Sequence, residues 1–589
     1  MLLIFLWLLL GLTCFYYGFF FYQRLCSYAI IEPSKSIEGS ELVMAGLGLF
    51  VILTQLLSLF VPVNYYMGAV WLIGAGAIAL RYAKELRHYY RRASTADNTT
   101  MLLWIGMALI VFCYSTLSPD HTDSSIYHLS SIRWSEEYSV VPGLGNLHGR
   151  LAFNSSFFVA SSALGMTALL GQTLFPINGF LFVLVSLILL KRIKSTHLTI
   201  SVLAAGSLVI ILFYLLRFVF SPTPDIAATL LPLVIFFLWI ENKPTFSFQT
   251  VLIVLLVFVS ITIKLANIPL LLALLFIAWP IRAQLTLSKI SLVIGIGLLL
   301  MVPWVVRNII LSGYLLYPFP GIDWFSVDWK VPLERVIHER DYVAFWAKFR
   351  VHESFMNTAL LEQPFTEWFP VWWERQGYFF NKPIWVLAVI SPLVVVSHWF
   401  DTDRRKRLLP LLGPYLVAFG GFVFWFLSAP DFRFGYPFIW FSALTPWAIF
   451  LPEFQNRVSL NRLKIGAVVS IMVAASGYFI GFHLIKNEFP IHQYLLIPKP
   501  LTYKSVGSYE QVFKPNRTSS GLTIFTPVGA PMNQNCYEVL MCSPFFYPDL
   551  KLRNREISEG FRSTLTSEKS YLSQALLKTS RGDKNRGKL

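Results

Sequence analysis

The sequence predicts an all-α polytopic membrane protein with about fourteen transmembrane helices and a small extramembrane α/β domain near its C-terminal end. Of the 589 residues, 55% are hydrophobic and only 14% are charged, whereas soluble domains carry about 25% charged residues. The mean hydropathy is +0.59. Uncharged apolar runs recur along the chain, and a run of roughly 20 residues is long enough to cross the hydrocarbon core of a bilayer.

The basic residues are distributed as in a membrane protein and not as in a nucleic-acid-binding protein. The formal net charge is +16, but the lysines and arginines gather in short loops between apolar runs. Cytoplasmic loops of membrane proteins carry such an excess of lysine and arginine. We therefore expect membrane lipids, and not nucleic acid, to surround this chain.

The N-terminal run "MLLIFLWLLLGLTCFYYGFFFYQRLC" lacks the basic start and small-residue cleavage site of a signal peptide. We interpret it as a retained first span of an accessory N-terminal part, residues 1–100. A core follows at 101–483, with outer loops 118–172 and 312–381. The predicted spans are 2–22, 42–62, 65–81, 101–117, 173–190, 197–216, 226–240, 248–263, 267–281, 289–310, 383–400, 408–427, 436–452 and 463–483.

The apolar segment 152–170 is long enough to cross, but charge argues against it. The basic loops are 81–92, 191–194, 401–407 and 456–464. If 152–170 crossed, the loop "KRIK" (191–194) would lie outside. If it instead forms a juxtamembrane helix along the outer surface, all four basic loops lie in the cytoplasm.

The tail, residues 484–589, is then expected outside the cytoplasm as a small α/β domain. The stretches "SGLTIFTPVGA" (520–530) and "YEVLM" (537–541) have strand character, with Pro and Gly between strand-like pieces. Cys536 and Cys542 lie in this tail and would pair in an oxidising compartment.

Two aspartates follow the fourth predicted span, in "SPDHTDSSIYHLSSIRW" (118–134). Their three-residue spacing puts Asp120 and Asp123 on one face of a helical turn. Each aspartate could simply cap the helix that follows. The functional alternative is a general base, with Asp120 and Asp123 also able to hold Mg²⁺ or Mn²⁺.

Further charged residues lie at the predicted outer ends of other spans. Lys264 interrupts "VSITIKLANIPLLL", Arg307 closes a span, and Asp431 and Arg433 lie in "APDFRFGY". Asp225 opens another span after "SPTP". The cations could only extend to the outer headgroups, or they could bind a lipid phosphate, with Asp431 orienting Arg433.

The loop aspartates, the juxtamembrane segment and the many spans resemble the GT-C superfamily of glycosyltransferases over residues 100–480. The segments 122–156, 307–332 and 429–436 resemble a bacterial, Bacteroidetes-like group of envelope proteins of this type. The resemblance implies transfer of a sugar from a polyprenyl-phosphate carrier to a glycan, lipid or protein acceptor. It also implies a location in the inner membrane, with the active site facing the periplasm.

The resemblance also implies residue roles. The acceptor-activating aspartate would be Asp123, or else Asp120. The phosphate-binding cations would be Lys264, Arg307 and Arg433, and we expect Tyr127, His128 and Asp431 to contribute to the substrate site. This chain departs from the family pattern because three further spans precede the span that leads into the aspartate loop and because the pair is D-x-x-D.

Other classes of protein remain as alternatives. A transporter or flippase of lipid-linked saccharides buries ionisable groups near the bilayer midplane, often in repeated halves. A polymerase or ligase of lipid-linked saccharides, or a non-catalytic scaffold, would also have many spans. The tryptophans of loop 312–381 would suit sugar rings, but tryptophan is also common at membrane interfaces.

Overall fold

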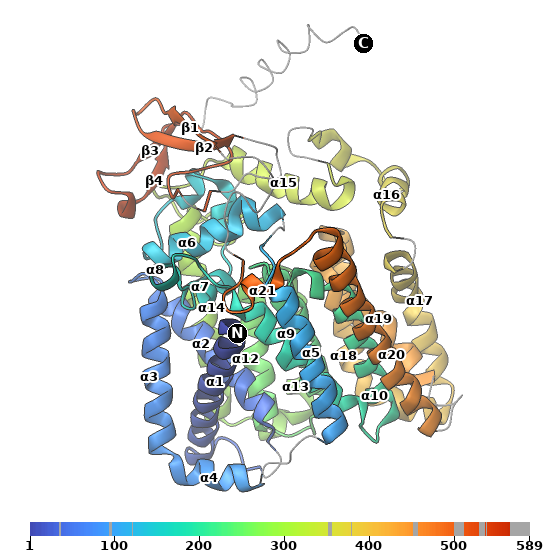
Figure 1. The fold of residues 1–589 in the computed structure, drawn as a ribbon. Coiled ribbons are helices and arrows are strands. Elements are labelled where there is room, and N and C mark those ends of the chain that lie inside the picture. The colour runs from blue at the N-terminus through green and yellow to red at the C-terminus, as the bar shows by residue number, and fades with distance from the viewer. Residues whose placement is uncertain are drawn as a thin grey trace.

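The computed structural model describes residues 1–34, 37–92, 97–119, 122–351, 356–377, 380–450, 457–499, 512–528, 536–537 and 539–565. Helices form a bundle, and short helices and strands cover one end of it (Figure 1). The prediction of an all-α polytopic membrane protein is confirmed at this level.

Ten helices in the described part of the chain are long and apolar enough to cross a membrane. They are α1 (Leu2–Ser27), α2 (Gly39–Leu57), α5 (Asn98–Ser115), α9 (Pro176–Ile193), α11 (Pro224–Glu241), α13 with its flanking turns (Leu265–Gln284), α14 (Leu287–Ser312), α17 (Asn381–Trp399), α18 (Thr402–Ser428) and Arg462–Lys486, which covers most of α20.

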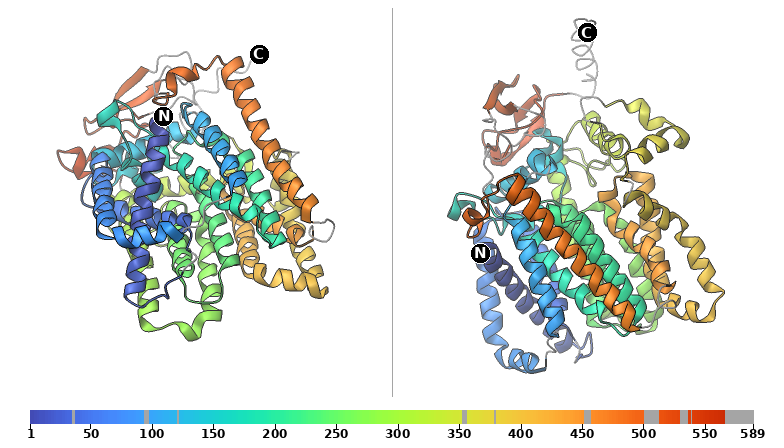
Figure 2. Two further views of the ribbon diagram at one scale, coloured as in Figure 1. Left: turned by 60° about the horizontal axis from the view of Figure 1, so that its bottom comes forward. Right: turned by 45° about the vertical axis from the view of Figure 1, so that its right-hand side comes forward.

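Four further helices lie among these in the bundle (Figures 1 and 2). They are α3 (Tyr65–Arg81), α10 (Leu198–Tyr214), α12 (Phe248–Ile263) and α19 (Phe432–Phe450). α10 and α12 are apolar but shorter than the ten. The predicted number of fourteen spans therefore stays a prediction.

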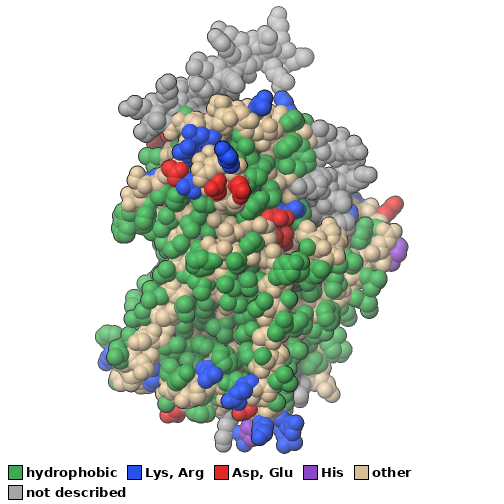
Figure 3. All heavy atoms as spheres, turned by 90° about the vertical axis from the view of Figure 1, so that its left-hand side faces the viewer, with side chains coloured by type: hydrophobic (Ala, Val, Ile, Leu, Met, Phe, Trp, Pro, Cys, Tyr) green, Lys and Arg blue, Asp and Glu red, His purple; other side chains and the backbone are tan. Residues whose placement is uncertain are grey.

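The two ends of the bundle differ in composition. The basic stretches end α9, begin α18 and form α4 (Ala83–Arg92), at the end opposite the strands (Figure 1). A broad hydrophobic band separates the two charged ends on the side that carries α3 and α4 (Figure 3). The strand end also holds the chain's N-terminus, because Leu2 N–H donates to Leu496 O over 3.0 Å.

The segment 152–170 forms two short helices, α7 (Ser156–Ser162) and α8 (Thr167–Leu170), and neither is long enough to cross a bilayer. Its placement along the outer side of the membrane stays a prediction; within the protein, α7 is buried against α2, α6 (Leu129–Glu137) and α12. Its polar residues find partners there: the Ser155 hydroxyl donates to Ile263 O at 2.7 Å.

The described C-terminal region consists of two antiparallel strand pairs. They are β1 (Val512–Arg517) with β2 (Thr523–Val528), and β3 (Leu550–Leu552) with β4 (Phe561–Ser563). Within the predicted range 484–589, the described residues contain one short α-helix, α21 (Ile491–Tyr494), and from 512 onward strands with one 3-10 turn. β2 lies inside the segment 520–530 that was expected to be extended.

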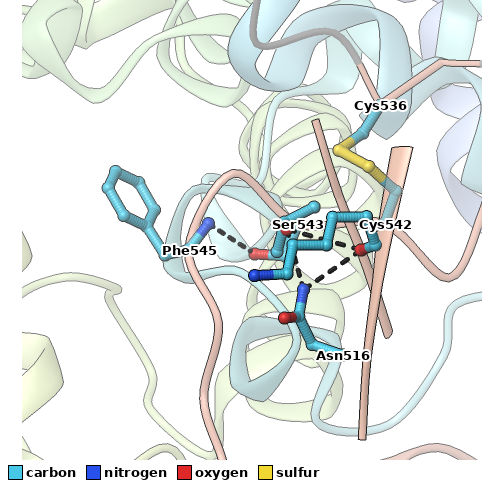
Figure 4. The surroundings of a disulfide bond; sticks show 7 residues. Asn516, Cys536, Cys542, Ser543 and Phe545 are labelled. Carbon is cyan, nitrogen blue, oxygen red and sulfur yellow. Dashed lines mark hydrogen bonds between the residues drawn. A yellow bond between two sulfur atoms is a disulfide. The ribbon is translucent and has the colours of Figure 1, made fainter. Parts of the chain in front are cut away.

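The second expected strand, 537–541, is wrong at its described positions, which form turns. Cys536 and Cys542 are joined by a disulfide (Figure 4). Beside it, Phe525 N–H donates to Met541 O and Ser543 N–H donates to Phe525 O. The segment around Cys542 is therefore held by one isolated β-bridge and the disulfide, and not by a ladder of strand hydrogen bonds.

The strands pack on the outer loops. Phe561 N–H donates to Pro142 O at 2.9 Å, and Arg335 of α15 (Leu333–Phe349) forms a 2.6 Å ion pair with Asp549. Buried side chains from both loops and the tail share one hydrophobic cluster. The two outer loops and the tail thus form one cap over the bundle.

Candidate functional site

Charged side chains from five separate helix ends meet beneath the cap. We call this group the outer charge cluster, and its members are Asp123, Asp225, Lys264, Arg350, Asp431 and Arg433. Their sequence separations are large, so only the tertiary fold brings them together. The cluster contains three carboxylates and three cations, and is therefore balanced in formal charge.

Arg433 is the centre of the cluster. Its Nη1 donates to Asp123 Oδ2 at 2.5 Å and lies 3.8 Å from Asp225 Oδ2. Its Nε lies 3.7 Å from Asp431 Oδ2. One guanidinium thus faces three carboxylates, and a guanidinium can exchange one such partner for a phosphate, because its planar fork matches both.

The other two cations pair with different carboxylates of this centre. Lys264 donates to Asp225 Oδ1, and its Nζ lies 4.2 Å from the ring centroid of Phe434. Arg350 Nη2 lies 3.4 Å from Asp431 Oδ1. The Arg350 side chain is 43% exposed, so this partner of Asp431 can leave without opening the fold.

Local structure explains how each carboxylate reaches the centre. Asp123 directly precedes a π-helical turn, η1 (Ser124–His128), and makes no side-chain cap hydrogen bond. Asp123 therefore does not cap the helix that follows it. Asp225 lies in the first turn of α11, and Asp431 lies between α18 and α19. π-turns of this kind occur often at functional sites.

Tyr127 and His128 lie on η1, in the turn that follows Asp123. His128 is 1% exposed, and its Nδ1 lies 3.1 Å from the Ser124 hydroxyl. The Tyr127 ring contacts His128 edge to face at 4.4 Å. Burial raises the pKa of the Tyr127 hydroxyl, and the nearby Asp123 adds to this, so Tyr127 stays protonated. Both residues are placed to hold η1.

Two sets of hydrogen bonds support the cluster from outside. Asn178 Nδ2 donates to Ser221 O at 2.8 Å and Thr223 O at 2.9 Å, which fixes the turn before Asp225. Trp372 Nε1 donates to Pro430 O at 2.7 Å and Trp425 Nε1 donates to Asp431 O at 2.6 Å. The buried Trp372 thus supports the Asp431 loop.

Arg307 lies apart from this cluster. It is 7% exposed; its Nη1 donates to Ser58 Oγ at 2.8 Å and its Nε to Asn154 Oδ1 at 3.2 Å. Within the described ranges no carboxylate forms an ion pair with it. The structure therefore brings together two of the three expected phosphate-binding cations, Lys264 and Arg433, but not Arg307.

The described carboxylates of the outer charge cluster are paired with cations of the chain itself. Arg433 occupies the space between Asp123, Asp225 and Asp431, and the described residues contain no group of three His, Cys, Asp or Glu side chains able to hold a metal ion. Asp120, the other expected ligand of Mg²⁺ or Mn²⁺, lies outside the described residues. We derive no chemical step through a metal.

Sequence reasoning missed Arg350 and did not choose Asp225 among the site residues. Arg350 ends α15 in the left-handed region with φ 49°, within a polar loop where arginine is common. Asp225 carried the same signal as Lys264, a charge at the end of an apolar helix. The supporting side chains Asn178 and Trp372 carried no sequence signal.

The cluster and the bundle together define an α-helical membrane protein with a charge-paired site at one end. A family model for a domain of unknown function, DUF8201, matches residues 1–440, and the chain belongs to that family. No curated protein and no solved structure matches the chain. The matched range includes every residue of the outer charge cluster.

Proposed function

We propose that this chain is a membrane glycosyltransferase that moves a sugar from a polyprenyl-phosphate carrier to an envelope glycan, lipid or protein acceptor. The observation that carries the proposal is the set of three carboxylates around Arg433, with Lys264 beside them. Such a transfer needs a base for the acceptor and cations for the departing phosphate. The cluster supplies both kinds of group.

In the proposed reaction, Arg433 and Lys264 bind the phosphate of the donor, and Asp123 accepts the proton of the acceptor hydroxyl. The acceptor oxygen forms a bond to the anomeric carbon while the bond from that carbon to the phosphate oxygen breaks. The electron pair stays on the phosphate, whose charge the two cations stabilise. One carboxylate is sufficient, because the phosphate leaves as an anion without protonation, unlike the leaving group in glycoside hydrolysis.

The ion pair between Arg433 and Asp123 gives this mechanism an order of events. A carboxylate that binds an arginine at 2.5 Å is a poor proton acceptor, because the cation stabilises its charged form. A donor phosphate competes for the same guanidinium. When Arg433 binds the donor phosphate, it releases Asp123. Asp123 is therefore available as a base only while the donor is bound.

The proposal includes the orientation and the number of spans. If all fourteen helices cross, including α3, α10, α12 and α19, the four basic loops lie on one side of the membrane, as cytoplasmic loops do. The outer charge cluster and the cap then face the periplasm of a bacterial inner membrane. This count and arrangement also suit a GT-C architecture.

A transporter, flippase or polymerase of lipid-linked saccharides is the alternative. Transporters place their ionisable groups near the bilayer midplane in broken helices. Here Asp225, Lys264 and Asp431 lie at helix ends on the cap side. This placement favours chemistry at the membrane surface over passage through the bundle.

The test compares envelope glycans and glycolipids, by mass spectrometry, from cells with the wild-type chain and with Asp123→Asn. We expect the variant to lack one sugar while its protein level is normal. Asp341→Asn is the matched control, since Asp341 pairs with its neighbour Arg340 on α15 at 2.7 Å. A wild-type profile in Asp123→Asn cells with normal protein level would refute the assigned base.

A further inference from the structure

A sharp corner lies at the end of the bundle opposite the cap. α3 and α4 meet at 81°, so α4 runs across the end of the bundle instead of continuing through it (Figure 1). A span followed by a perpendicular helix places that helix in the plane of the membrane surface. α4 is therefore positioned at the level of the lipid headgroups.

The sequence of α4, "AKELRHYYRR", separates apolar from basic residues. Leu86 is buried, and the rings of Tyr89 and Tyr90 lie 5.6 and 5.7 Å from that of Phe15 on α1. The Tyr89 hydroxyl also donates to Ile37 O at 3.3 Å. These contacts fix α4 against α1 and set the shape of the corner before any ligand binds.

The inside of the corner forms a shallow, open groove of about 460 Å³. Its apolar part comes from α1 and the end of α3, and its basic part from α4. The lining residues are Tyr16, Ala79, Ala83, Leu86, Arg87, Tyr90 and Arg91. The small side chains of Ala79 and Ala83 leave the inside of the bend open.

Arg87 and Arg91 are four residues apart and therefore lie on the same side of α4. Like charges at this spacing disfavour a helix. Both are exposed, and neither forms an ion pair with any carboxylate that the structure describes. α4 carries four lysines and arginines against one glutamate, Glu85, so the basic edge of the groove carries an excess of positive charge.

We propose that this groove binds an anionic phospholipid, with the headgroup phosphate between Arg87 and Arg91 and an acyl chain along Tyr16, Ala79 and Leu86. Charge complementarity selects the phosphate, because paired arginines bind it through parallel N–H donors. The apolar floor and the position of α4 at headgroup level select a lipid over a free anion. Figure 3 shows lysine and arginine side chains along the lower edge of the hydrophobic band on this side.

The test measures retained lipid on the purified full-length protein by native mass spectrometry, after exchange into micelles that contain phosphatidylglycerol. The variant is Arg87→Gln with Arg91→Gln. Each basic residue near an anionic surface contributes about 1 kcal/mol, so we expect apparent affinity to fall on the order of 30-fold. The pair Arg87→Lys with Arg91→Lys keeps the charge and should retain most of the binding.

The matched control is Arg405→Gln with Lys406→Gln, which removes the same charge from exposed positions on α18 at the same end of the bundle. We expect this control to retain phosphatidylglycerol as the wild type does. Equal retention by all variants, or equal retention of phosphatidylcholine, would refute the site. Displacement of the lipid by millimolar inorganic phosphate would also overturn the proposal and identify the site as one for a free anion.

Discussion

Arg433 and Arg307 lie at the same end of the bundle, but their surroundings differ in charge. Arg433 faces the carboxylates of Asp123, Asp225 and Asp431. Arg307 donates to a serine hydroxyl and an asparagine amide oxygen. Of these two arginines, Arg433 is positioned to exchange a carboxylate for a phosphate, because carboxylates are its described partners. A buried cation near the membrane surface is therefore not sufficient to identify a phosphate site.

The neutral surroundings of Arg307 continue along α6. Glu136 is 8% exposed, and its carboxylate accepts hydrogen bonds from the hydroxyls of Thr167 and Thr173, each at 3.2 Å. Burial raises the pKa of Glu136 to about 7. We call this part, with Arg307, Asn154, Glu136, Thr167 and Thr173, the neutral-partner region. In it, Arg307 and Glu136 form hydrogen bonds with neutral side chains.

The largest expected effect is loss of the centre of the outer charge cluster. Arg433→Met leaves three carboxylates facing one another. Removing one partner of a buried ion pair costs about 3–5 kcal/mol, and partial exposure reduces this, so we expect about 2–4 kcal/mol of lost stability. Arg307→Met removes bonds only to neutral partners and should cost about 1–2 kcal/mol. Unfolding in mixed micelles measures both.

A double-mutant cycle sharpens this prediction. If Asp123 is strained by the loss of Arg433, Asp123→Asn should restore part of the stability of Arg433→Met, with a coupling of about 1–2 kcal/mol. The same Asp123→Asn change should be additive with Arg307→Met. Coupling of equal size in both cycles would mean that the two arginines do not differ in the way proposed.

The second prediction concerns pH and the neutral-partner region. The pKa of Glu136 is raised from 4.5 to about 7, so the folded chain binds this proton more tightly than the unfolded chain. Stability therefore falls as the pH rises from about 4.5 to about 7 and is constant above, by up to about 3 kcal/mol. Glu136→Gln should remove this fall, because glutamine does not ionise.

Unfolding free energies measured at pH 5 and pH 8 test this sign. Glu137→Gln is the matched control, since Glu137 is the neighbouring, more exposed carboxylate and pairs with Arg133 at 2.9 Å. We expect the control to keep the pH dependence of the wild type. A wild-type difference between the two pH values in Glu136→Gln would show that Glu136 ionises freely in the folded protein.

The contrast between the two arginines also explains how far the sequence could predict the site. Hydropathy indicates the depth of a residue along the membrane normal, because apolar run length has a fixed relation to bilayer thickness. Lys264, Arg307 and Arg433 were found in this way. Hydropathy does not indicate where a helix lies around the bundle, so nothing in the sequence separated Arg307 from the other two.

Polar segments offered weaker signals. Arg350 lies in the long outer loop, where charged residues are common and so carry no sequence signal. It nevertheless contacts Asp431. The expected strand 537–541 failed for a related reason. Tyr537 is buried beside the disulfide of Cys536 and Cys542, and Leu540 and Met541 pack partly buried against the cap. Apolar residues that pack in this way and apolar residues of a paired strand give the same sequence pattern.

The smallest expected effect comes from an exposed ion pair on the surface of the cap, which we compare with the buried charges above. Arg553 pairs with Asp328 at 3.0 Å, with exposed fractions of 23% and 43%, and this contact lowers the pKa of Asp328. Because exposed pairs contribute under about 1 kcal/mol, Asp328→Asn should raise hydrogen exchange in 550–563 by less than about fivefold. The effect should fade as the pH falls from the ordinary pKa of aspartate through the lowered pKa of Asp328, because the unfolded chain binds the proton first and the folded chain only at the lower pH. Asp549→Asn, which removes the buried partner of Arg335, is the comparison. If Asp328→Asn raised hydrogen exchange as much as Asp549→Asn, the exposed ion pair would stabilise the cap as strongly as the buried one.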